Sequence, residues 1–267
     1  MNSTLRIALG AAAVIAVVLA GVALMPRSDS SVGGPGGAPS ASPSPTPTPS
    51  PTATAASSPA VVELPGYSAL LAPGDYFAAM PGGSPKITFT LPERWISRYS
   101  IAFKDRGGTG EIAFGLWVVD NVYTDPCRWT GALIDPPVGP TGDDLATALT
   151  TQKRRNASPP TDVTLGGYPA KRIELSIPAN LDKATCDKGV IRTWVSPGED
   201  PTAIENIEDP DALPTELVAP RSGQLNVVYI VDIDGARAVI DTWHMPGTSA
   251  ADLAELDAIL ASMRIGP

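Results

Sequence analysis

The chain has two cysteines, Cys127 and Cys186, which could form a redox pair, a zinc site or a structural disulfide. They lie too far apart in the chain for a redox pair, because redox motifs keep their cysteines close, as in Cys-x-x-Cys. A zinc site needs more ligands than the chain supplies, since it contains a single histidine, His244. In an oxidising compartment two thiols are most simply one disulfide, and we predict the bond Cys127–Cys186.

Residue types that hydrolases use are present, but their surroundings do not favour an enzyme. His244 ends a predicted strand, and the chain has no Gly-x-Ser-x-Gly elbow to supply a nucleophile. Asp120 and Asp125 flank aromatic residues and are the carboxylates that glycosidase chemistry would use. Neither a Gly-x-Gly-x-x-Gly motif nor a phosphate-binding loop occurs. We expect a non-catalytic protein without a cofactor, and an exported hydrolase remains an alternative.

The segment from Asp120 to Trp129 gathers side chains suited to contact a ligand. Tyr123, Arg128 and Trp129 offer two aromatic rings and a cation, and such residues often dominate binding energy. We therefore predict a ligand-binding site at these three residues. The alternative is structural: the disulfide pins this loop over the sheet, and the aromatic rings pack beneath it.

The stretch from Glu199 to Glu216 is rich in carboxylates and has no basic residue. Weak extracellular calcium sites use carboxylates and carbonyls. The spacing does not match an EF-hand loop, so a solvated acidic loop is the favoured interpretation and a calcium site is the alternative. The candidate calcium ligands are Glu205, Glu208, Asp209 and Asp211.

The charge balance excludes some partners. The chain has 28 acidic and 19 basic residues, which gives a net charge of −9 at neutral pH. A nucleic acid or an anionic lipid surface attracts proteins of the opposite sign. We therefore expect neither as a partner.

The N-terminal residues form an uninterrupted apolar run from Ile7 to Met25. At ~1.5 Å per residue, a helix of this length nearly crosses a ~30 Å hydrocarbon core. We predict that residues 1–26 are a single transmembrane anchor, inserted through residues 7–25, with the rest of the chain outside the cytoplasm. The alternative is a signal peptide cleaved after the small residues Gly21 to Ala23, which would release the protein by secretion.

Residues 27–63 are rich in proline, serine, threonine and glycine. This composition offers little apolar surface to bury, so we predict a disordered linker. Alternating proline favours extended polyproline II, which suits a spacer between a membrane and a folded domain.

Residues 64–267 are predicted to fold as one domain. Strands are expected where polar and apolar residues alternate or where apolar runs occur, and an Asp-Gly pair predicts a tight hairpin between the last two strands. The expected strands are 86–91, 99–103, 111–119, 162–165, 168–177, 190–195, 225–232 and 236–244. One helix is expected to begin near Thr141 and to end in the basic triplet 153–155. A second begins at Ser249.

These elements predict an α+β fold, with an antiparallel sheet of about six to eight strands and two principal helices behind an N-terminal hydrophobic helix and a disordered linker. Three short motifs resemble the PsbP-like α/β sandwich of some exported bacterial lipoproteins: Leu91-Pro92-x-x-Trp95, the segment Gly166 to Ala170 and the segment Ile259 to Met263. The domain also resembles membrane-anchored exported domains of high-GC bacteria. The resemblance implies an antiparallel sheet with packed helices and implies no catalytic residues.

The sequence therefore predicts a membrane-tethered extracytoplasmic domain that binds a cell-surface ligand or a protein partner. A structural spacer of the cell wall, without a specific ligand, is a further alternative.

Overall fold

The computed structural model describes residues 60–80, 85–202 and 220–266. Residues 55–267 form a compact unit by themselves. The described part contains three β-sheets, of four, nine and two strands, and two α-helices. No helix within it is long and apolar enough to cross a membrane. The predicted anchor, and the predicted linker up to residue 59, lie outside the described residues.

The predicted α+β class is wrong, because the described chain is mostly β-structure. The sheets include several strands of only two or three residues, which are too short to be predicted from a sequence pattern. Part of the excess is a separate four-stranded sheet, of which the sequence indicated only the strand 86–91.

The large sheet is antiparallel throughout and carries the site described below. Its long central strands are the ones that the sequence predicts best. In spatial order the strands are β10 (Thr161–Leu165), β11 (Tyr168–Ser176), β13 (Leu225–Ile233), β14 (Ala236–His244), β7 (Ile112–Trp117), β6 (Ile101–Lys104), β5 (Ile96–Arg98) and β2 (Ala69–Leu70), and β9 (Asn156–Ala157) also pairs with β11.

The β13–β14 hairpin confirms the prediction from Asp-Gly. Ile233 pairs with Ala236, so Asp234 and Gly235 alone form the turn. Their φ angles are +54° and +84°. Two-residue hairpin turns with positive φ at both positions match the twist of the strands, and asparagine, aspartate and glycine tolerate that conformation best.

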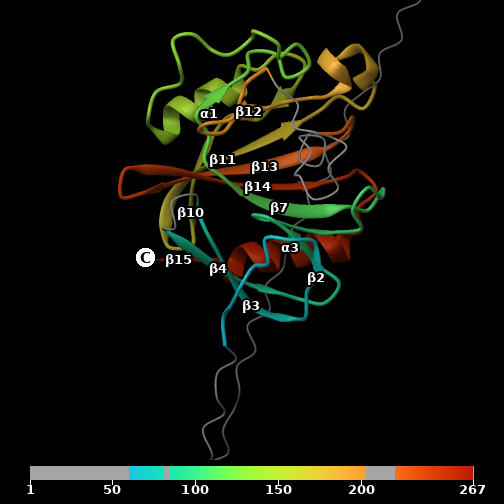
Figure 1. Ribbon diagram of the computed structural model, residues 1–267, viewed down its shortest axis with the longest axis vertical. Helices are drawn as coiled ribbons and strands as arrows, with labels where there is room; N and C mark the ends of the chain where they lie inside the picture. The colour runs from blue at the N-terminus through green and yellow to red at the C-terminus, as the bar shows by residue number, and fades with distance from the viewer. Residues whose placement is uncertain (1–59, 81–84, 203–219, 267) are drawn as a thin grey trace, which may run out of the picture. The chain divides into compact units, whose positions relative to one another are not determined.

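The second sheet and one helix cover one face of the large sheet (Figure 1). The sheet consists of β1 (Val62–Glu63), β3 (Gly74–Ala79), β4 (Lys86–Leu91) and β15 (Arg264–Gly266), in the order β1-β3-β4-β15. Helix α3 (Ala250–Ser262) packs with it in the main apolar core. Trp95, predicted as a core residue, is completely buried there.

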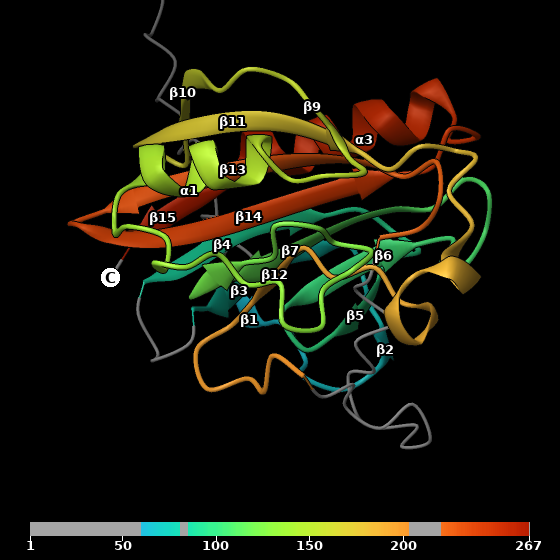
Figure 2. The same ribbon diagram turned by 90° about the horizontal axis from the view of Figure 1, so that it is seen from above.

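Helix α1 (Gly142–Thr150) lies on the opposite face, over β11 and β13 (Figure 2). The two-stranded sheet of β8 (Asn121–Val122) and β12 (Trp194–Val195) also packs on this side. Successive side chains of a strand point to opposite faces. Alternate residues of β7, β13 and β14 therefore face α1, and the others face α3.

Both predicted helix starts are confirmed. The Thr141 side chain accepts from the Asp144 backbone in a capping box, and the Ser249 side chain accepts from the Asp252 backbone. The predicted end of the first helix is wrong, because α1 stops at Thr150 and the basic triplet 153–155 lies beyond it. These basic side chains therefore do not complement a helix dipole; Arg154 pairs with Asp125, and Arg155 donates to Thr193 and Asn226.

Candidate functional site

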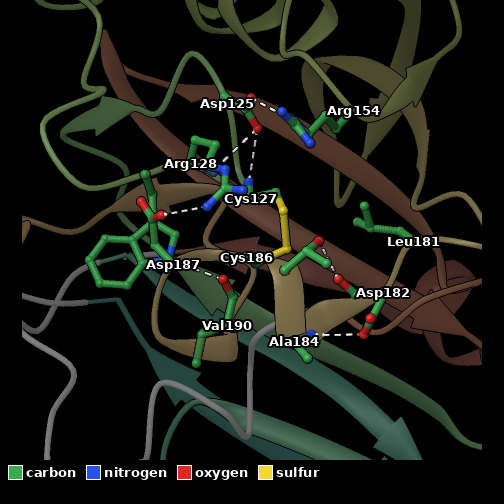
Figure 3. The surroundings of a disulfide bond; sticks show 12 residues. Asp125, Cys127, Arg128, Arg154, Leu181, Asp182, Ala184, Cys186, Asp187 and Val190 are labelled. Carbon is green, nitrogen blue, oxygen red and sulfur yellow. Dashed lines mark hydrogen bonds and ion pairs between the residues drawn. A yellow bond between two sulfur atoms is a disulfide. The ribbon is translucent and has the colours of Figure 1, made fainter.

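The predicted disulfide is confirmed: Cys127 and Cys186 are bonded, with a sequence separation of 59 and 4.5 Å between their Cα atoms. Both residues are buried, in a small apolar cluster with Ile177 and Ile191. Two short 3-10 helices, Lys183–Thr185 and Asp187–Gly189, hold Cys186 between them. Figure 3 shows that the bond ties a first segment, the loop before residue 130, to a second segment, which contains Cys186 and the two 3-10 helices.

Asp125 shapes the first of these two segments (Figure 3). Its Oδ1 accepts from the backbone N–H of Cys127 at 3.0 Å and of Arg128 at 3.3 Å. Its Oδ2 pairs with Nε of Arg154 at 2.9 Å. One arginine of the basic triplet is thus explained, because its charge meets a carboxylate that is itself held by the loop backbone.

Asp187 joins the second segment to the first. Its carboxylate accepts from the Thr130 backbone N–H at 2.9 Å and pairs with Arg128 Nη1 at 3.3 Å. The backbone hydrogen bond from Thr130, with a smaller contribution from Arg128, lowers the pKa of Asp187. These contacts and the disulfide fasten the same two segments.

Tyr123 and Trp129 lie inside this loop and are completely buried. Their ring centroids are 6.2 Å apart in an edge-to-face arrangement. The Tyr123 hydroxyl donates to the carbonyl of Pro201 at 2.9 Å, and Trp129 Nε1 donates to the carbonyl of Val190 at 3.0 Å. Burial raises the pKa of Tyr123 to about 12. Both polar atoms are therefore used to hold neighbouring backbone.

Arg192 packs against both rings. Its guanidinium lies 5.3 Å from the Tyr123 ring centroid and 5.0 Å from that of Trp129, within cation–π range. The Arg192 side chain is 2% exposed and pairs with Glu199. The loop interior is thus an arginine held between two aromatic rings, with its charge compensated by a carboxylate.

The three predicted ligand residues therefore have different environments. Tyr123 and Trp129 face the interior, whereas the Arg128 side chain is 52% exposed. The aromatic packing fits the alternative interpretation, in which the disulfide pins a structural loop over the sheet. Ligand binding at this loop stays a prediction, and Arg128 is the member of the trio that a ligand can reach directly.

A buried polar row, not predicted from the sequence, lies between this loop and the large sheet. Arg155 donates through Nη1 to Thr193 Oγ1 at 2.6 Å and through Nη2 to Asn226 Oδ1 at 3.1 Å. Asn226 Nδ2 in turn lies 3.1 and 3.0 Å from the two carboxylate oxygens of Asp241. An asparagine amide thus separates a buried cation from a buried anion.

Burial favours the neutral forms of both ionisable groups of this row, Asp241 and Arg155. It raises the pKa of Asp241 to about 7 and lowers the pKa of Arg155 to about 10. Asn226 favours the ionised form of Asp241, and so does the charge of Arg155, but both effects are smaller than that of burial. The sequence signal was an aspartate at a core-facing position of an otherwise apolar strand.

The other predicted site residues do not gather. The His244 Nδ1 atom lies 3.2 Å from the carbonyl of Met245, and Asp120 is exposed. The calcium candidates Glu205, Glu208, Asp209 and Asp211 lie outside the described residues. Within the parts that are described, no group of three or more histidine, cysteine, aspartate or glutamate side chains is arranged to hold a metal ion.

Comparison with known proteins adds little. No protein-family model and no curated protein match the chain. The crystal structure of LpqN, described as involved in cell envelope biogenesis of Mycobacterium tuberculosis, is similar at 12% sequence identity and a TM-score of 0.35. The match covers 69% of this chain and 85% of that one. A likeness at this level carries no argument about function, and the resemblance to PsbP-like domains stays a prediction.

Proposed function

We propose that this protein is a membrane-tethered extracytoplasmic domain that binds a ligand or a protein partner at the cell surface and catalyses no reaction. The Cys127–Cys186 disulfide is the observation that carries the proposal. Structural disulfides persist in oxidising compartments and are rare in the cytosol. The apolar run 7–25 and the linker that follows supply the sequence features of an exported, tethered domain.

The position of the disulfide supports a structural role in an exported protein. Both cysteines are buried, and the hydrogen bonds of Asp125 and Asp187 hold the same two segments that the bond joins. A catalytic or redox-sensing cysteine is instead typically exposed and beside a cationic group that lowers its pKa.

The non-catalytic part of the proposal rests on what the candidate residues do. Asp125 is committed to two backbone N–H groups and to Arg154, so it supports the loop. The ring of His244 lies against the carbonyl of the next residue. The alternatives remain an exported hydrolase and a structural spacer of the cell wall without a ligand.

The rigidity of the pinned loop supports the proposed binding role. Arg128 projects from a segment whose backbone is fixed by Asp125, Asp187 and the disulfide. A cation held on a rigid base loses less conformational entropy when it binds an anionic group.

Fractionation of cells that make the full chain tests the location. The protein should sediment with membranes, and protease added to intact cells should digest the domain. A matched variant that lacks residues 7–25 should leave the membrane fraction and resist external protease. A full-length domain that stays protected until the cells are broken would contradict the proposal.

Thermal unfolding of residues 55–267 tests binding, because this part forms a compact unit. The probes are calcium chloride, fragments of wall glycan and lipid vesicles. A ligand at 100 times its dissociation constant adds about 2.7 kcal/mol. The midpoint should then rise by several degrees, at about 2–4 °C per kcal/mol for a domain of this size. The absence of a shift with all three would favour a protein partner or the spacer.

A further inference from the structure

Four buried side-chain polar atoms of the described residues lack a hydrogen-bond partner: Trp117 Nε1, Gln152 Oε1, Arg155 Nε and Arg221 Nη2. The last is accounted for, because Arg221 Nη2 lies 2.9 Å from Glu111 Oε2 and forms an ion pair. Buried polar groups in folded proteins nearly always have a partner, protein or ordered water. The remaining three atoms therefore need an explanation.

The three side chains that carry these atoms all contact residue 193 or 194. Gln152 Nε2 donates to the Thr193 carbonyl at 2.8 Å, and Arg155 Nη1 donates to the Thr193 hydroxyl at 2.6 Å. The ring of Trp117 contacts the ring of Trp194, with centroids 6.1 Å apart. Two of the three side chains therefore bond to Thr193, and the third packs its ring on Trp194.

Asp241 faces the same region from the sheet. It pairs across strands with Gly115 of β7. A Cβ atom on Gly115 would lie only 2.8 Å from Trp117 Nε1, so the absence of a side chain there lets the indole N–H lie over the sheet. Residues directly opposite in adjacent strands have Cβ atoms about 4.5–5.5 Å apart. The indole N–H is thus a near neighbour of Asp241.

The unpaired polar atoms of this region include both donors and an acceptor. Trp117 Nε1 and Arg155 Nε are donors, and Gln152 Oε1 is an acceptor. The Asp241 carboxylate has about four acceptor positions, and among the described residues only Asn226 Nδ2 donates to it. A group that both accepts and donates completes such a set, whereas a simple cation or anion would satisfy one half of it.

We propose that Trp117, Gln152, Arg155 and Asp241 form an internal binding site for O–H groups, in which a hydroxyl oxygen accepts from Trp117 Nε1 or Arg155 Nε and donates to Asp241 or Gln152. The oxygen comes from ordered water or from a hydroxyl of a neutral sugar or polyol. Buried waters typically make about three hydrogen bonds to groups that otherwise lack partners. Trp117 and Trp194 are only partly buried, so the ring pair beside the site reaches the surface.

A high-resolution crystal structure of residues 55–267, alone and soaked with glucose, tests the proposal. The expected result is an oxygen atom about 2.7–3.2 Å from Trp117 Nε1 or Arg155 Nε. Its identity as water in both crystals assigns the site to solvent, and its replacement by a glucose hydroxyl assigns it to a ligand. Absence of any such oxygen in both crystals, or a protein group in its place, overturns the proposal. The ligand assignment rests on the proposed binding function, whereas the water assignment holds even if that function fails.

Two matched variants separate this site from general packing. Trp117→Phe removes the buried N–H and should abolish the oxygen next to the ring. Trp194→Phe changes the partner ring of the same pair, whose N–H is not among the buried unpaired atoms, and should leave the oxygen in place. Loss of the oxygen in both variants, or in neither, contradicts the assignment to Trp117. If Trp117→Phe does not fold, NMR cross-relaxation between bound water and the Trp117 indole proton in the unchanged protein gives the same decision.

Discussion

Asp241 places an ionisable carboxyl group in the buried interior of the protein. It lies at the centre of the large sheet, paired with Val228 on one side and Gly115 on the other. The amide of Asn226 separates it from the cation of Arg155. A buried ion pair is seldom a net source of stability, because removing both charges from water costs several kcal/mol. We therefore expect the row to make the stability of the protein depend on pH.

The free energy of unfolding should fall as the pH rises from about 4 to 7. Burial raises the folded-state pKa of Asp241 to about 7, against an unperturbed value of 3.8. Between these pH values the folded state binds the proton of Asp241 more tightly than the unfolded state does. The stabilisation from this proton is therefore complete below about pH 4 and is lost by about pH 7. At about 1.4 kcal/mol per pH unit, the full change is on the order of 4 kcal/mol.

Urea unfolding at several pH values between 4.5 and 7.5 measures this slope. Asp241→Asn should flatten it, because the variant has no titrating carboxyl group in the row. Asp257→Asn, at an exposed position of α3, is the matched control and should keep the slope. Equal slopes in the unchanged protein and in Asp241→Asn would show that the carboxyl does not titrate in this range.

The disulfide-pinned loop is the element in which covalent, ionic and aromatic contacts meet. It combines one covalent bond, two carboxylates that hold backbone N–H groups, and an arginine between two aromatic rings. The disulfide, Asp187 and Arg192 tie the segment before residue 130 to the segment around residue 190, and Asp125 holds the backbone of the first segment. The loop should therefore lose its structure as a unit when one of these contacts is removed.

Removal of the disulfide should lower the thermal midpoint substantially. Closing a loop of 59 residues stabilises a protein by about 4 kcal/mol in the chain-entropy model. At about 2–4 °C per kcal/mol, the Cys127→Ser/Cys186→Ser variant should unfold roughly 8–16 °C lower. Calorimetry of the oxidised protein, the reduced protein and the variant checks this, with the last two expected to agree. An unchanged midpoint would mean that the bond adds no stability.

Trp129→Ala and Arg128→Ala should separate structure from surface within this loop. Truncation of a fully buried tryptophan costs about 3–5 kcal/mol. The Arg128 side chain is half exposed and makes a surface ion pair, so its loss should cost less than about 1 kcal/mol. Denaturant unfolding measures both. A small loss for Trp129→Ala would contradict the structural role of the ring.

The sequence predicted the elements that depend on local chemistry. The Asp234–Gly235 hairpin, the caps at Thr141 and Ser249 and the strand 86–91 are all confirmed. Each depends on a turn residue, a capping side chain or an alternation within a few positions. The predicted strand 190–195 shrinks to Trp194–Val195, because the segment before it is held by the disulfide loop.

The elements that the sequence missed depend on long-range pairing. Strand β15 is three residues long and exists because it pairs with β4, far away in the chain. The site shows the same limit: the cysteine pair was predictable from composition, whereas the meeting of Arg155, Asn226 and Asp241 required the register of β13 and β14 and the path of the chain after α1.

At the scale of the whole molecule, we propose that the folded domain resides outside the cytoplasm. The buried disulfide, the apolar N-terminal run and the spacer-like sequence after it support this location. The excess of acidic over basic residues, 28 to 19, fits a partner other than a nucleic acid. The binding proposals depend on this location only through the kind of ligand that is available there.

The redox state of Cys127 and Cys186 in the cell tests that claim most directly. Cells that make the full chain are quenched in acid, treated with a thiol-alkylating reagent, and the protein is weighed by mass spectrometry before and after reduction. The chain has only these two cysteines, so the mass reports their state without ambiguity. A Cys127→Ser variant, whose remaining thiol must be alkylated, is the control. If the domain is exported, neither cysteine is alkylated until the protein is reduced; alkylation of both in the quenched cells would contradict a location outside the cytoplasm.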